Sequence, residues 1–195
     1  MANATVLLVM NFLALCVAMA GISVGAAGCS WWKKDNPIEF TEGLWRACAK
    51  TNCSSRENIL EFTDFHQEKD IILTLLLCGG FFTAVATMSA LCLCCCKESY
   101  GGWKCGSVVL LIFSWMAVAA NVGAMTYAEI KFKDEWDTFD HGWSAISAWV
   151  GAGMCVFTFF MAISLMRLSP TTRKTSAYIE NFEESHQNQS MTTYE

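Results

Sequence analysis

Four long stretches without a single charged residue decide what this chain can fold into. No Asp, Glu, Lys or Arg occurs at positions 1–32, 71–96, 105–128 or 142–166, although 16% of all residues are charged. Each stretch exceeds the roughly 20 residues that a helix needs to cross about 30 Å of hydrocarbon. Inside a bilayer the backbone polar groups must bond to one another, which favours helices. A soluble bundle is excluded because its helices would each keep a charged face toward water.

The sequence therefore predicts an all-α membrane protein, an antiparallel four-helix transmembrane bundle within residues 1–166. We expect the spans at 5–28, 71–92, 107–127 and 143–166, with polar loops at 29–70 and 129–142. The first span could also be read as a cleaved signal peptide, but it lacks a basic n-region and its apolar run is longer than the usual length of about 7 to 15 residues. Residues 167–195 are polar and predict a disordered cytoplasmic tail.

Small residues recur at helical spacing in the first span, at Ala14, Ala18, Gly21 and Gly25. Such a stripe lets another helix backbone approach closely, and packing inside the bundle explains it more simply than dimerisation does. In the third span Asn121 is expected to bond across to a neighbouring helix.

The first polar loop carries the most specific pattern in the chain. Cys48 and Cys53 are separated by four residues, which favours a tight turn with the two sulfurs facing each other. In an oxidising compartment the two would form a disulfide, and Cys29 would stay free or buried at the membrane edge. Asn52 begins a sequon and is a candidate glycosylation site. Trp31, Trp32 and Trp45 are expected at the level where hydrocarbon meets water.

The second span ends in a cluster of cysteines beside Lys97, namely Cys92, Cys94, Cys95 and Cys96. Thiols at a membrane edge next to a basic residue are candidates for acylation, because the attached chains would enter the adjacent leaflet. A metal site is the alternative. Adjacent cysteines on a helix point in different directions and no His lies nearby, so we expect neither a metal nor a cofactor.

The distribution of Lys and Arg does not settle on which side of the membrane the loops lie. The two loops carry eight of the thirteen Lys and Arg residues, which would place the loops inside. We nevertheless expect both termini in the cytoplasm. The cysteine pair and the sequon then lie on the extracellular side, and the acylation cluster lies on the cytoplasmic side. The net charge of −5 comes from residues of the loops and the tail. A negative charge does not indicate a surface that binds nucleic acid. The spans hold no ionisable acid, base or His, so neither an enzyme nor a transporter is expected.

The order of Trp31 or Trp32, then Gly43-Leu44-Trp45, then Cys48 and Cys53 resembles the first-loop signature of the claudin superfamily. That superfamily includes claudins, peripheral myelin protein, epithelial membrane proteins, lens fibre membrane intrinsic protein and calcium-channel gamma subunits. The resemblance implies that these residues shape a small extracellular antiparallel β-sheet, formed mainly by the first loop. The cysteine spacing looks most similar to the lens fibre branch. Claudins commonly end in a hydrophobic PDZ-binding residue, whereas Glu195 is charged.

This resemblance implies a structural, non-enzymatic protein of the plasma membrane that organises cell–cell contacts or junctions through its extracellular loops. Its partners would be membrane lipid and the same or other claudin-like proteins in the same or the opposing membrane. The alternative is an auxiliary subunit that modulates an ion channel or receptor, as the resemblance to gamma subunits implies.

Overall fold

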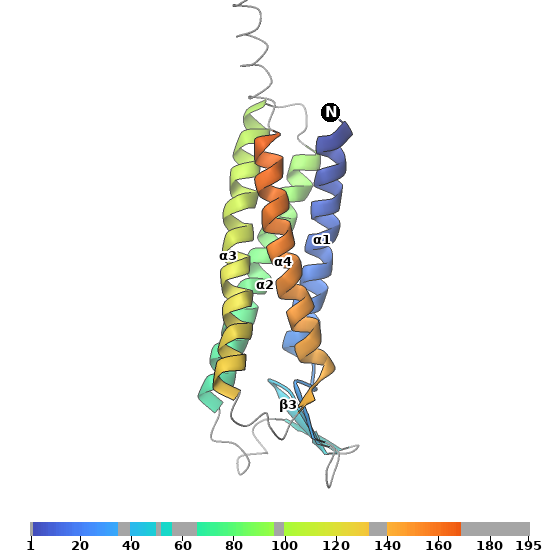
Figure 1. Ribbon diagram of the computed structural model, residues 1–195, viewed down its shortest axis with the longest axis vertical. Helices are drawn as coiled ribbons and strands as arrows, with labels where there is room; N and C mark the ends of the chain where they lie inside the picture. The colour runs from blue at the N-terminus through green and yellow to red at the C-terminus, as the bar shows by residue number, and fades with distance from the viewer. Residues whose placement is uncertain are drawn as a thin grey trace, which may run out of the picture.

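The computed structural model describes residues 2–34, 40–49, 52–55, 66–95, 100–132 and 140–168. Four long helices dominate it: α1 (Ala2–Ala27), α2 (His66–Cys95), α3 (Tyr100–Phe132) and α4 (Trp143–Arg167). All four are long and apolar enough to cross a membrane. They form a bundle in which α1 packs against α2 and α4, and α3 packs against the same two helices (Figure 1). The predicted transmembrane bundle is confirmed.

Two helices extend well beyond the charge-free stretches. Helix α2 begins at His66 and so takes in Glu68, Lys69 and Asp70 before the apolar run, and α3 continues past Glu129 to Phe132. The bundle is therefore longer than its apolar part. The charged residues of these two helices are confined to their end turns. The predicted tail, 169–195, lies outside the described residues.

A small sheet covers one end of the bundle, which we call the sheet end (Figure 1). Its strands are β1 (Trp32–Lys34), β2 (Phe40–Glu42), β3 (Arg46–Ala49), β4 (Asn52–Ser55) and β5 (Asp140–His141), in the order β4-β3-β2-β1-β5 with every pairing antiparallel. The first four come from the first loop, as the resemblance implies. The second loop adds β5, which is too short to leave a period in the sequence.

The hydrophobic core of the sheet end joins the first loop to the helices. Trp31, Trp32 and Leu44 belong to one buried cluster with side chains of α2, α3 and α4, among them Ile72, Leu76, Met125 and Ala148. We call this cluster the sheet-end core. The expected level of Trp31 and Trp32 at the membrane surface stays a prediction, but both side chains face the protein, because Trp31 is 1% and Trp32 5% exposed. Their large apolar surfaces are buried inside the protein.

The opposite half of the bundle, which we call the far end, has its own core. Its buried residues include Leu8, Leu15, Leu93, Leu110 and Leu165, so that all four helices contribute. Between the two cores lies a smaller cluster that contains Ala18, Ile22 and Cys155.

Helices α1 and α4 meet along the small-residue stripe. A Cβ atom added to Gly21 would lie 2.8 Å from the Ser147 carbonyl oxygen and 3.0 Å from Gly151 Cα, and one added to Gly25 would lie 2.6 Å from Ala148 Cβ. Backbone therefore touches backbone, which only glycine permits at such a distance. The prediction that the stripe serves packing inside the bundle is confirmed.

Candidate functional site

The sheet is fastened to the bundle where α1 ends and α4 begins. Backbone hydrogen bonds run from Gly142 N to Trp31 O (2.7 Å) and from Ser144 N to Ser30 O (3.0 Å). In return, Ser30 N donates to the Ser144 hydroxyl at 3.2 Å. A Cβ at Gly142 would overlap the Ser30 carbonyl oxygen, so a glycine is required there. The first and second loops are thus tied together beside the membrane.

Trp31 closes the end of α1. Its indole Nε1 donates to the Gly25 carbonyl oxygen at 2.6 Å. Gly25 lies in the last turn of α1, whose carbonyls have no partner within the helix. The same side chain therefore fills the sheet-end core and satisfies a buried acceptor.

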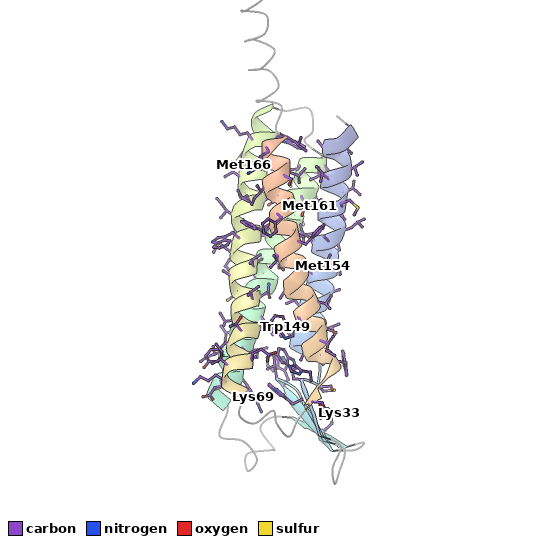
Figure 2. The ribbon with its side chains drawn as sticks, in the orientation of Figure 1. Lys33, Lys69, Trp149, Met154, Met161 and Met166 are labelled. Carbon is purple, nitrogen blue, oxygen red and sulfur yellow. The ribbon has the colours of Figure 1, made fainter. Side chains whose placement is uncertain are left out.

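Trp32 lies beside Trp31, with ring centroids 5.7 Å apart. The Lys69 ammonium of α2 stands 5.7 Å from the Trp32 ring centroid, a cation–π distance. Lys69 is 5% exposed, which is unusual for lysine. In Figure 2 Lys69 lies at the sheet end of α2, the same end as Lys33 on the sheet. The contact holds β1 against α2.

The Gly43-Leu44-Trp45 motif divides into inward and outward parts. A Cβ at Gly43 would lie 2.6 Å from Cys29 Cα, so Gly43 lets the loop cross the chain that leaves α1. Leu44 is buried in the sheet-end core. Trp45 is 47% exposed, so burial of its side chain in the core cannot be how it shapes the sheet. Its side chain lies on the surface of the protein.

Cys48 and Cys53 stand directly opposite each other in the β3–β4 ladder, which turns between Ala49 and Asn52. This pairing agrees with the predicted turn, whose residues Lys50 and Thr51 lie outside the described part of the chain. Cys48 is disulfide-bonded and buried, while Cys29 is free and half-buried. The register and the oxidised state of Cys48 both support the predicted Cys48–Cys53 bond.

Replacing Cys48 with Ser should lower the free energy of unfolding by roughly 2 kcal/mol, because the bond closes only a short loop. Cys29→Ser is the matched control and should cost little. Thermal unfolding of the two purified variants measures the difference. Non-reducing peptide mapping that recovers Cys29 linked to Cys48 or Cys53 would contradict the pairing.

A second junction joins α3, α4 and β5 at the sheet end. Glu129 Oε1 accepts a hydrogen bond from Trp149 Nε1 at 3.1 Å, and His141 Nε2 lies 3.2 Å from the same oxygen. Trp149 is labelled on α4 in Figure 2. The sequence gives no signal for this junction, because its members are 12 and 20 positions apart and match no helical or strand period. It fixes β5 and hence the edge of the sheet.

Glu129→Ala should therefore destabilise the protein by about 1 kcal/mol, since these partners are partly exposed. A double-mutant cycle with Trp149→Phe isolates the hydrogen bond from general packing. Additive effects of the two substitutions would show that the bond contributes nothing measurable.

A model of the PMP-22/EMP/MP20/Claudin family matches residues 4–162. The chain belongs to that family. The match covers most of α1, all of α2 and α3, all five strands and most of α4. A search of individual curated proteins found no match. The expected membership is confirmed, and this is a four-span membrane protein of the junction and PMP-22 type; its place in the lens fibre branch stays a prediction.

In this claudin-family chain the candidate acylation cysteines lie at the far end. Cys92, Cys94 and Cys95 are exposed on the last turn of α2, and Cys105 is exposed near the start of α3. Cys96 lies outside the described residues, and Asn52 is the first residue of β4. Among the residues that the structure describes, no group of three or more His, Cys, Asp or Glu could hold a metal ion.

Proposed function

We propose that this protein organises cell–cell contacts at the plasma membrane without catalysing a reaction. It associates with itself or with other claudin-family proteins, in the same or the opposing membrane. The observation that carries the proposal is the five-stranded sheet, to which both loops contribute and which is fastened to the bundle by the Ser30, Trp31 and Glu129 contacts. A preformed surface loses less conformational entropy on binding than loose loops would.

The proposed sidedness has its own support. An oxidised Cys48 requires an oxidising compartment, so the sheet belongs on the extracellular side. The start of α1, the end of α2, the start of α3 and the end of α4 then lie on the cytoplasmic side (Figure 1). The exposed Cys92, Cys94 and Cys95 face the cytoplasmic leaflet, where reversible acylation occurs.

Strand β4 is the element best placed to make contacts. It pairs only with β3 among the described strands, which leaves its second edge open. Alternation in a ladder that turns at Ala49 and Asn52 leaves the N–H groups of Cys53 and Ser55 on that edge. An open edge can accept a strand of another molecule. Asn52 begins this strand and stays the proposed glycosylation site.

An aggregation assay in non-adherent cells tests this role. Cells that express the protein should cluster, and Ser55→Pro should abolish clustering because it removes an outward N–H group without breaking the β3–β4 ladder. Ser55→Ala removes only the side chain and should cluster like the parent. Equal clustering of both variants at equal surface expression contradicts edge pairing; no clustering of the parent contradicts the adhesive role.

One observation favours the auxiliary-subunit alternative. Trp115 of α3 and Phe159 and Phe160 of α4 form a row of mutually tilted rings, with ring centroids 5.4 and 5.7 Å apart. Trp115 is 56% and Phe160 61% exposed on the membrane-facing surface. Such a row could pack against a span of a channel or receptor. A stoichiometric partner that is lost with Trp115→Leu and Phe160→Leu, but kept with Phe81→Leu on the exposed face of α2, would support this alternative.

Acyl-exchange labelling of protein from cells tests the proposed lipid attachment. Cys92, Cys94, Cys95 and Cys96 should carry acyl chains, whereas Cys155, which is fully buried, should not. Free thiols at all four positions in mature protein would contradict acylation and leave these cysteines a packing role.

A further inference from the structure

The interior of the bundle contains polar side chains at depths where hydrocarbon surrounds the protein. Each helix contributes at least one that is no more than 1% exposed: Asn11, Thr83, Ser114, Asn121 and Thr158. In a membrane a polar group without a partner costs more than in water, since no solvent can replace the missing bond.

Thr83, Thr158 and one atom of Asn121 are satisfied by their own helices. Thr83 donates to Gly79 O at 2.7 Å, and Thr158 donates to Cys155 O at 2.8 Å. Asn121 Nδ2 donates to Ala117 O at 2.9 Å and contacts Cys155 Sγ of α4 at 3.6 Å, so its expected bond to another helix is a weak one to sulfur. The Asn121 amide also presses on Gly79, where a Cβ would overlap it. Asn121 Oδ1 has no hydrogen-bond partner among the described residues.

Asn11 and Ser114 differ in that none of their side-chain polar atoms is satisfied. Within the described part of the chain, the side-chain amide nitrogen and oxygen of Asn11 and the hydroxyl of Ser114 have no hydrogen-bond partner. Both residues are 0% exposed. Asn11 lies on the face of α1 that carries Leu8 and Leu15, one turn from each. Ser114 lies one turn after Leu110 on α3. These three leucines belong to one contact cluster, the far-end core.

The far-end core also holds the unpartnered donor Trp103 Nε1, and the chemistry of the Asn11 and Ser114 atoms selects their ligand. Asn11 presents one donor and one acceptor, and the Ser114 hydroxyl can act as either. The spans that carry them contain no charged residue, so an ion would find no counter-charge. A ligand that is small, neutral and able both to donate and to accept is water, which in protein interiors makes about three hydrogen bonds.

We propose that the far-end core binds water between Asn11 of α1 and Ser114 of α3. The water completes the hydrogen bonding of both side chains. It also links two helices that do not follow each other in the chain, which adds a polar contact of fixed geometry to a core otherwise held by non-directional packing. This inference does not depend on the proposed contact function.

X-ray radiolytic labelling in lipid nanodiscs tests the site directly, because hydroxyl radicals formed from bound water modify the side chains next to it. Leu15 and Leu110 should be modified several-fold faster than Leu76 of the sheet-end core, although all three leucines are at most 1% exposed. Asn11→Leu should bring Leu110 down to the rate of Leu76. Equal rates for the three leucines in the parent protein would overturn the proposal.

Thermal unfolding provides a second test, because a core with bound water and a dry core predict changes in Tm of opposite sign. If water is bound, Asn11→Leu and Ser114→Ala should each lower Tm by about 2 to 4 °C, and the double variant should lose less than their sum. The control Ser89→Ala removes a hydroxyl that is satisfied by Val85 O and should not couple to Asn11→Leu. A rise in Tm with Asn11→Leu would overturn the proposal, because it shows that the amide was buried without a partner.

Discussion

Replacing Trp31 with alanine should lower the free energy of unfolding by about 3 to 5 kcal/mol, a large part of the stability of a protein of this size. The side chain is 1% exposed in the sheet-end core, where residues of the first loop and of the helices belong to one cluster. Its removal would leave a cavity and would also leave the Gly25 carbonyl oxygen without the indole donor. The sheet should loosen from the bundle as a consequence.

Three tryptophan variants separate these effects in thermal unfolding measurements. Trp31→Phe keeps most of the packing and loses the hydrogen bond, so it should cost about 1 to 3 kcal/mol. Trp45→Ala removes the same side chain from a site that is 47% exposed and should cost well under half as much as Trp31→Ala. If Trp31→Ala and Trp45→Ala are equally mild, Trp31 does not anchor the sheet.

The second large effect is expected at the contact between α1 and α4. Gly21→Leu should prevent close approach of the two helices, because its Cβ alone would lie 2.8 Å from a backbone oxygen and 3.0 Å from Gly151 Cα. Backbone cannot move aside as a flexible side chain can, so the cost should reach or exceed about 3 kcal/mol. Little folded protein should be recovered from cells.

Gly153→Leu on α4 is the matched control, since a Cβ there meets nothing within 4 Å. Both substitutions add the same apolar group to a membrane helix. Size-exclusion profiles and surface expression of the two variants should therefore differ sharply. Loss of folded protein with both would point to a general intolerance of helix glycines and against a specific α1–α4 contact.

The sequence predicts those parts of the fold that follow from the surroundings of the chain. A bilayer leaves uncharged stretches of this length no choice but a helix, and the four helices appear where the charges are missing. The spacing of Cys48 and Cys53 likewise predicts a turn, because a short separation allows few conformations. The glycine stripe predicts close packing because small side chains leave the backbone accessible.

The rest depends on contacts between distant parts of the chain. Trp31, Trp32 and Trp45 are the same residue type at the same end of the molecule, yet two are buried and one is exposed. The direction of each depends on how the sheet meets the helices. The partners of Glu129 and the pairing of β5 with β1 are set by the same docking, and no local pattern reveals them.

The bond between Ser30 and Ser144 has a consequence for the order in which the protein is made. The two residues are 114 positions apart, and β5 precedes the later one by only a few residues. At a synthesis rate of roughly 5 to 20 residues per second, the first loop waits on the order of 10 s for the segment that completes its sheet. During that time α1 and Trp31 have been translated but α4 has not. Early in synthesis the first loop therefore exposes a sheet that lacks β5 and the Ser144 contact.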